Sequence, residues 1–251
     1  MSGPTTVTAA VLVIGDEILS GRTKDRNLGY IAEYLGGLGV DVREARVVPD
    51  IEDDIVAALD ALRARYDYVL TTGGIGPTHD DITADAIARA FGVPIGEDPR
   101  VIAAMLQRYP EGELTPARRR MARIPASAEL IENPISIAPG FRIGNVYVMA
   151  GVPSIMQAML DSAVKTMRTG AVMQVETVEA GGLPEGRYGD PLAEIAAAHR
   201  EASIGSYPSL KDGRFLNQIV VRSKDPAAVA AAKSAVEAML DRLRGESKPS
   251  A

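Results

Sequence analysis

The sequence predicts an α/β fold in which a mostly parallel sheet is covered by helices on both faces, followed by a small α+β domain. Within residues 1–168, short apolar runs alternate with segments whose apolar residues recur at helical spacing, which is typical of parallel sheets. Over residues 169–245 the order changes to a β-α-β-β-α unit. Residues 246–251 are expected to form a disordered tail.

The first domain opens on a nearly continuous apolar run from Thr8 to Ile14, as expected of a strand buried on both faces. The later segments are identified by apolar spacing and by glycine or proline at their ends. Strands are predicted at 42–48, 68–72 and 143–149, and helices at 27–39, about 55–62, 83–91, within 99–109, 116–122 and 154–167.

The second domain is predicted from a shorter set of elements. Its strands are expected at 172–178, 203–207 and 215–222, its helices around 191–199 and from about Val229 to Leu243. A glycine-rich turn at 181–186 separates the first strand from the first helix.

Composition limits the functions open to the chain. It has 251 residues and no cysteine, so a metal ion would need oxygen ligands or one of two histidines. The formal net charge of -6 argues against nucleic acid as a partner. A dense basic cluster, Arg118, Arg119, Arg120 and Arg123, is interpreted as a solvated helix face. No apolar run is long enough to span a bilayer, and a cytoplasmic location is expected.

The segments that follow the predicted strands carry the informative residues, because ligands of open α/β sheets bind beyond the carboxyl ends of the strands. Four such segments are 15–17, 49–50, 73–81 and 151–154. If their strands are parallel, all four lie on one rim of the sheet.

The segment 73–81, with the sequence GGIGPTHDD, combines three glycines with two terminal aspartates. The glycines and the helix that follows suit an anion such as phosphate. Asp81 or Thr83 could simply cap that helix. The other acids expected on the rim favour a functional role for at least one of Asp50 and Asp81, such as holding Mg²⁺ or orienting an attacking group. His79 has no evident partner and is interpreted as polar surface.

Two further features have simpler interpretations available. Asn27 opens a predicted helix and could be its N-cap. The segments 133–134 and 138–141 flank a turn, and turn chemistry alone would account for them.

Several motifs together resemble the molybdopterin-binding domain family of molybdenum-cofactor biosynthesis proteins, especially the branch at the front of CinA, the competence/damage-inducible protein. The motifs are GDEILSG at 15–21, Asp25 and Asn27, VVPD at 47–50, TTGGIGPTHDDIT at 71–83, APGF at 138–141 and GVP at 151–153. The resemblance covers residues 7–165. Ile75, where threonine is usual, 135–137 and 149–150 depart from the family pattern.

The resemblance implies a three-layer α/β fold whose glycine-rich loop holds a pterin or adenylated ligand. Asp50 and Asp81 match the functional acids and become the candidate catalytic residues and metal ligands. The candidate ligand-binding residues are Gly15, Asp16, Glu17, Asn27, Thr72, Gly73, Gly74, Gly76, Pro77, Thr78, Asp80, Pro139, Gly140, Gly151, Pro153 and Ser154.

Three functions follow from the resemblance. The first is binding of a molybdopterin-type or adenylated phosphate-bearing ligand. The second is pyrophosphatase activity on ADP-ribose or a related dinucleotide with Mg²⁺, Mn²⁺ or Co²⁺. If the chain is an enzyme, the expected reaction is phosphoanhydride chemistry, either this cleavage or adenylyl transfer to the pterin phosphate. The third is a non-catalytic interaction protein whose KH-like second domain contacts RNA. A homo-oligomer is also expected, whereas the deamidase activity of a further CinA domain is not.

Overall fold

The computed structural model describes residues 6–110, 112–211 and 214–246, without the side chains of 210–215. The chain divides into two compact units, one of residues 6–170 and one that begins at Ala171. Each is described by itself. Residues 247–251 of the expected tail lie outside the described part. Glu246 was wrongly assigned to the tail, since the last helix includes it. Extending an established helix costs little because each added residue gains a hydrogen bond.

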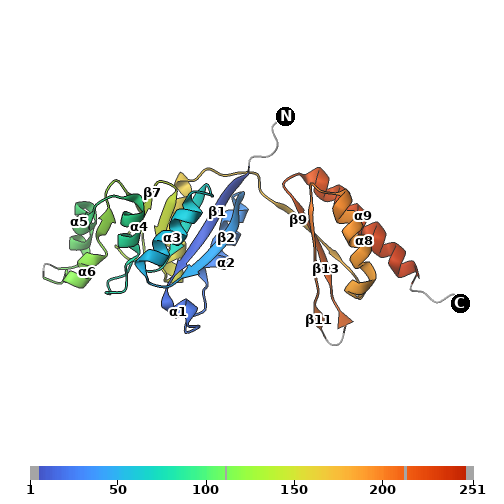
Figure 1. The fold of residues 1–251 in the computed structure, drawn as a ribbon, viewed down its shortest axis with the longest axis horizontal. Coiled ribbons are helices and arrows are strands. Elements are labelled where there is room, and N and C mark those ends of the chain that lie inside the picture. Colours follow the sequence, from blue (N-terminus) through green and yellow to red (C-terminus); the bar gives the residue numbers. More distant parts are fainter. Residues whose placement is uncertain (1–5, 111, 212–213, 247–251) are drawn as a thin grey trace. The chain divides into compact units, whose positions relative to one another are not determined.

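The larger unit is a six-stranded sheet with helices on both faces (Figure 1). The strands of this unit are β1 Val7–Ile14, β2 Val40–Val48, β3 Tyr68–Thr72, β4 Ile95–Glu97, β5 Arg123–Pro125, β6 Glu129–Ile131, β7 Gly140–Ile143 and β8 Val146–Met149. Of these, β4 and β5 form a separate two-stranded antiparallel sheet. Its helices are α1 Asp16–Leu19, α2 Asn27–Gly37, α3 Glu52–Arg63, α4 Thr83–Phe91, α5 Pro99–Arg108, α6 Pro116–Arg120, α7 Pro153–Ala163 and the 3-10 turn Val164–Thr166.

The strand order of the main sheet is β2-β1-β3-β8-β7-β6. β2, β1, β3 and β8 are parallel, and β7 and β6 continue the sheet antiparallel at one edge. The alternating side chains of β1 reach two separate cores. Leu12 and Ile14 pack with α3 and α4, while Val11 and Val13 pack with α2 and α7. The predicted mostly parallel α/β fold is therefore confirmed.

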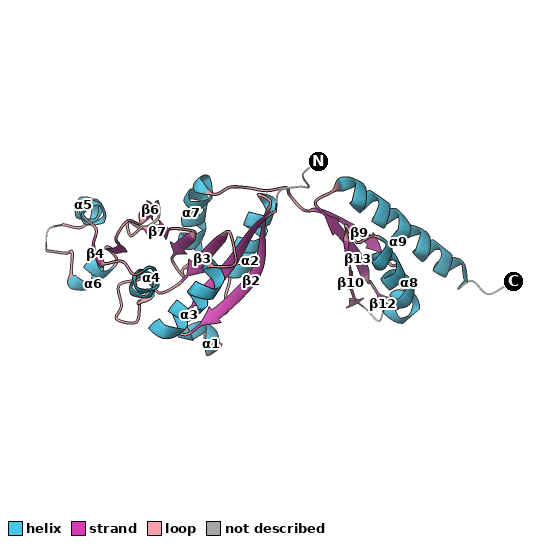
Figure 2. Cartoon of the chain, turned by 45° about the horizontal axis from the view of Figure 1, so that its top comes forward, coloured by secondary structure: helices cyan, strands magenta, loops and turns pink. Residues whose placement is uncertain are grey.

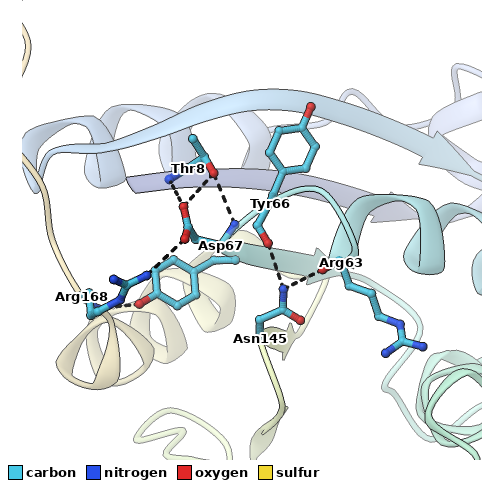
Figure 3. Close-up of polar contacts among 7 residues, drawn as sticks. Thr8, Arg63, Tyr66, Asp67, Asn145 and Arg168 are labelled. Atoms are coloured by element: carbon cyan, nitrogen blue, oxygen red, sulfur yellow. Dashed lines mark hydrogen bonds and ion pairs between the residues drawn. The ribbon is translucent and has the colours of Figure 1, made fainter. Parts of the chain in front are cut away.

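The expected single strand over 143–149 was wrong in extent. The chain forms a hairpin there, in which β7 ends at Ile143, Gly144 adopts a positive φ of 57° and β8 begins at Val146. Glycine adopts this conformation without steric cost, so the turn can be tight. The Asn145 side chain binds the backbone oxygens of Arg63 and Tyr66, at 3.0 Å each (Figure 3).

Asp67 links several segments at the end of the sheet that lies opposite the glycine-rich loop. Its carboxylate accepts hydrogen bonds from the backbone nitrogen and the hydroxyl of Thr8, at 2.9 and 2.8 Å, and pairs with Arg168 at 3.1 Å (Figure 3). These hydrogen bonds, the one from the Thr8 backbone foremost, lower the pKa of Asp67. The contacts join the start of β1, the start of β3 and the end of the larger unit.

The smaller unit is an antiparallel sheet of order β10-β13-β9 with two helices packed against each other and against the sheet (Figure 2). Its elements are β9 Gln174–Glu179, α8 Glu185–Ala198, β10 Ser203–Tyr207, β11 Leu210–Lys211, β12 Arg214–Phe215, β13 Gln218–Ser223 and α9 Pro226–Glu246. The helix expected around 191–199 begins six residues earlier than predicted, because Pro191 is accommodated inside α8 and does not start it. Along the described ranges, no helix is both long and apolar enough to cross a membrane.

Candidate ligand-binding site

The parallel strands β1, β3 and β8 carry the loops that follow them to one rim of the sheet, where a cavity of about 510 Å³ opens. Eight of the candidate site residues line it. They are Glu17, Gly73, Gly74, Gly76, Pro77, Asp81, Gly151 and Pro153. Three of the four predicted loops thus contribute to one cavity.

The loop between β3 and α4 needs glycine at its start. Gly73 has a φ of 105°, and a Cβ there would lie 2.1 Å from the backbone oxygen of Ile14. Gly74 has a φ of 66°, and a Cβ there would lie 2.2 Å from the hydroxyl of Thr83. Both positions combine a left-handed backbone with no room for a side chain. These glycines let the loop fold back against β1 and α4.

The simpler alternative, in which Asp81 or Thr83 caps α4, was wrong. The N-cap residue is Ile82, which makes no side-chain cap. The fully buried Thr83 instead donates its hydroxyl proton to the Gly73 backbone oxygen, at 2.9 Å. Asp81 accepts hydrogen bonds from the backbone nitrogen and the hydroxyl of Thr78, so its carboxylate folds back over the loop beside Gly76. Asp81 is thereby held at the cavity wall.

Asp50 plays a different part from Asp81. One of its carboxylate oxygens accepts the backbone N–H of Asp16, at 3.0 Å, which ties the end of β2 to the start of α1. Partial burial raises the pKa of Asp50, and the charges of Asp16, Glu17 and Asp80 raise it further, against the lowering effect of that hydrogen bond. Asp50 does not line the cavity.

Asn27 connects two of the rim loops. Its amide group donates a hydrogen bond to the Gly151 backbone oxygen, at 2.8 Å, and only 4% of the residue is exposed. The expected N-cap role was wrong, because Asp25 accepts the first backbone N–H groups of α2, those of Asn27 and Leu28. The side-chain oxygen of Asn27 is buried without a hydrogen-bond partner. Asn27 and Thr72 line a side pocket of about 60 Å³ that shares Glu17, Gly73 and Gly151 with the main cavity.

The remaining candidates lie around the cavity without lining it. They are Gly15, Asp16, Thr78, Asp80, Gly140 and Ser154, while Pro139 lines a smaller adjoining pocket. Gly140 lies within β7, where a Cβ would come 2.4 Å from the Val148 backbone oxygen, so it permits close strand packing. The His79 side chain is 96% exposed, as its interpretation as polar surface requires.

Sequence reasoning did not include one wall of the cavity, formed by Asn133, Ser136 and Ala138. The Asn133 side chain organises this wall. It accepts the backbone N–H groups of Ile135 and Ser136 and donates to the Ser136 hydroxyl and the Ala138 oxygen. The Asn-Pro turn signal was visible in the sequence, but its place at the cavity was not. The rest of the lining consists of Thr23, Ala150, Val152 and the apolar side chains of Ile75, Met121, Ile155 and Met159.

A cation site built from Asp50 and Asp81 was also expected. Within the described ranges, no group of three or more histidine, aspartate and glutamate side chains lies close enough together to hold a metal ion. The two acids hold different loops, Asp50 through the backbone of Asp16 and Asp81 through Thr78. Among the described side chains there is therefore no preformed Mg²⁺ site with three or more such ligands.

An α/β domain with a cavity at the carboxyl ends of its parallel strands, closed by a glycine-rich loop, belongs to the class of small-molecule-binding α/β proteins. Residues 10–169 match the family described as "Probable molybdopterin binding domain", and residues 180–244 match "FAD synthase, middle domain". The chain therefore belongs to the molybdopterin-binding domain family.

Individual relatives agree with this assignment. A CinA-like protein of Citrifermentans bemidjiense is 42% identical over 193 residues, which cover 73% of this chain and 46% of the relative. One of Desulfosudis oleivorans is 35% identical over 209 residues, covering 76% and 49%. The crystal structure of "the protein CinA with unknown function" from Thermoplasma acidophilum is similar with a TM-score of 0.60 and 37% identity, over 64% of this chain and 96% of that one. The chain spans about half the length of the two CinA-like relatives.

Proposed function

We propose that the cavity binds a molybdopterin-type ligand, a pterin that carries a phosphate, in free or adenylated form. The observation that carries the proposal is the cavity itself, about 510 Å³ at the rim of a sheet whose sequence belongs to the molybdopterin-binding family. Small-molecule sites are typically of about 300–1,000 Å³ and combine apolar walls with a few polar groups.

The lining of the cavity suits a flat ring that bears hydrogen-bond donors. Ile75, Met121 and Met159 offer apolar surface against which a ring can pack. Ile75 also packs against both cores of the larger unit, so the side chain that replaces the usual threonine is a fixed part of this wall. Glu17 and Asp81 provide carboxylate oxygens, which accept hydrogen bonds from the amino and ring N–H groups of a pterin.

The alternatives have less support from the described side chains. Cation-dependent cleavage of ADP-ribose calls for carboxylates that converge on a metal ion, and Asp50 and Asp81 are bound to separate loops. RNA binding by the smaller unit is disfavoured by the net charge of -6 and by an aromatic content of 4%. Self-association and a cytoplasmic location stay predictions of the family resemblance.

Equilibrium titration of the purified chain with molybdopterin and with its adenylated form tests the proposal. We expect saturable binding, and about tenfold weaker binding in Asp81→Asn, because one charged acceptor is removed from the cavity wall. His79→Gln is the matched control, since His79 lies in the same loop and is 96% exposed. A folded wild-type protein that binds neither compound would refute the proposal.

A further inference from the structure

Four arginines that the sequence predicts to form a solvated helix face lie in α6 and at the start of β5. Three of them, Arg118, Arg119 and Arg123, bind other residues of the larger unit. Arg118 stacks on the Tyr109 ring, at 4.2 Å from its centroid, and donates to the Glu113 backbone oxygen. Arg119 pairs with Glu97. Arg123, just after the helix, makes two hydrogen bonds to Asp85, at 2.6 and 2.8 Å. These contacts fix α6 and the segment behind it in place.

Arg120 differs from its neighbours. It is partly buried, and its side chain makes no hydrogen bond or ion pair with any residue the structure describes. The Nε–H group in particular is shielded from solvent and has no acceptor. Leaving a buried donor of a charged group unpaired is unfavourable, and a bound anion would supply the missing acceptor. The interpretation of this arginine as part of a solvated face was therefore wrong for its buried Nε–H group.

The size and the neighbours of the pocket around Arg120 indicate which chemical group it can bind. It lines a pocket of about 20 Å³ together with Gly74, Ile75 and Gly76 of the glycine-rich loop. These three loop residues, with Asp81 and Met121, also line the main cavity, so the small pocket adjoins it. A volume of this size admits about one water-sized group. It suits an oxygen of a phosphate and excludes a ring.

The glycine-rich loop offers donors beside this arginine. The backbone N–H groups of Gly74, Ile75 and Gly76 have no acceptor among the described residues, whereas that of Gly73 is bound to the Met149 oxygen. Successive free backbone N–H groups next to a guanidinium form a site for a phosphate group. The loop lacks a lysine or arginine of its own, and α6 brings one to it from about forty residues further along the chain.

The acids nearby do not neutralise Arg120. Asp85 lines the same pocket, but both of its oxygens are bound by Arg123. Asp81 is bound by Thr78 and makes no ion pair with Arg120. The guanidinium is therefore available to a ligand.

We infer that Arg120 is the cation that binds the phosphate group of the ligand, with the backbone N–H groups of Gly74 to Gly76 as the other donors. This inference rests on the proposed function in taking the cavity as the ligand site. It divides the site in two: the apolar cavity with Glu17 and Asp81 receives the ring, and the Arg120 pocket beside it receives an oxygen of the phosphate. The ligand class is thus a phosphate ester or a diphosphate.

The test compares three probes by equilibrium titration: a pterin phosphate ester, the same pterin as the free alcohol, and inorganic diphosphate. The wild type is expected to bind the ester more tightly than the alcohol. In Arg120→Gln, affinity for the ester and for diphosphate falls by about 10- to 100-fold, the amount that one charge-assisted hydrogen bond represents, and affinity for the alcohol is unchanged. Arg119→Gln, on the same helix with its partner at the surface, binds all three probes like the wild type.

Arg120→Lys provides a second test in case Arg120→Gln does not fold. It is expected to retain part of the preference for the ester, because lysine keeps the positive charge but lacks the planar guanidinium group. Equal losses for ester and alcohol in a folded Arg120 variant would overturn the inference, as would a wild type that prefers no phosphate compound. If the wild type binds diphosphate through Arg120 but neither pterin, the pterin proposal fails and the phosphate site stands. If the wild type binds the ester and the alcohol with equal affinity, the phosphate site is refuted and the proposal that the cavity binds a pterin stands.

Discussion

Asp50 carries a carboxylate whose ionised form is made unfavourable by burial and by neighbouring charges, and that carboxylate also binds the backbone at the start of α1. Its carboxylate receives the backbone N–H of Asp16 and lies near the charges of Asp16, Glu17 and Asp80, and burial is the main reason why its pKa is raised. A raised pKa means that the ionised carboxylate is less favourable in the folded chain than in the unfolded one. At neutral pH this charge therefore opposes folding.

Replacing Asp50 by asparagine is expected to raise the free energy of unfolding at pH 7, by no more than about 1 kcal/mol because the group stays in partial contact with water. The amide oxygen can still accept the Asp16 N–H. The gain exists above the raised pKa and disappears as the pH falls below about 4, the ordinary pKa of aspartate. Urea unfolding of both proteins across this range measures it.

The same variant separates two roles for this acid. Because Asp50 does not line the cavity, pterin affinity in Asp50→Asn should stay within about threefold of the wild type. A variant that is less stable at pH 7 would contradict the prediction that the charge opposes folding. Loss of binding in a folded variant would show that the Asp50 carboxylate takes part in ligand binding.

At the scale of elements, the loop from β3 to α4 decides the shape of the site. Thr83, at the start of α4, binds the backbone of both Gly73 and Gly74, through its hydroxyl and its N–H group. The loop after β8 also packs closely against Gly73, since a Cβ on Gly151 would lie 3.2 Å from the Gly73 Cα atom. The loop is therefore packed between β1, β8 and α4. Its glycines Gly73 and Gly74 are needed for this packing, whether or not they also contact a ligand.

Gly73→Ala should lower the free energy of unfolding by at least about 2 kcal/mol, because the new methyl group would meet the Ile14 oxygen at a φ of 105°. Gly29→Ala is the matched control. Gly29 lies in α2 with open space around it, so alanine there should stabilise the chain by about 0.5–1 kcal/mol. Urea titration of both variants checks the difference, and equal effects would contradict the packing of the loop.

At the scale of the whole molecule, each of the two units has its own hydrophobic core. The larger unit has one core on each face of its sheet, and the smaller unit packs Tyr188, Val221 and Leu240 into a third. Cores that share no residues can unfold separately. All the described residues that line the ligand cavity belong to the larger unit.

A chain shortened to residues 1–170 is therefore expected to fold, to keep the unfolding transition of the larger unit within about 4 °C, and to bind pterin like the full chain. Calorimetry of both proteins and titration of the shortened one provide the comparison. An unfolded or non-binding shortened chain would show that the smaller unit supports the site.

Local pattern in the sequence was enough to determine the α/β fold and most of its elements, because apolar period and glycine or proline boundaries are local properties of the chain. β1, β3 and α4 are found almost where spacing predicts them. The hairpin from β7 to β8 and the true start of α8 were missed, since a short continuous apolar run and an internal proline each allow more than one interpretation.

The sequence by itself also determined that the glycine-rich loop lies at the rim, because the carboxyl ends of parallel strands share one edge of a sheet. Only the tertiary structure decided which side chains meet there. It placed Asp81 but not Asp50 in the cavity wall, and it brought Arg120 beside the glycine-rich loop. The physical reason is that contacts between distant segments depend on the path of the whole chain, which the period of apolar residues does not contain.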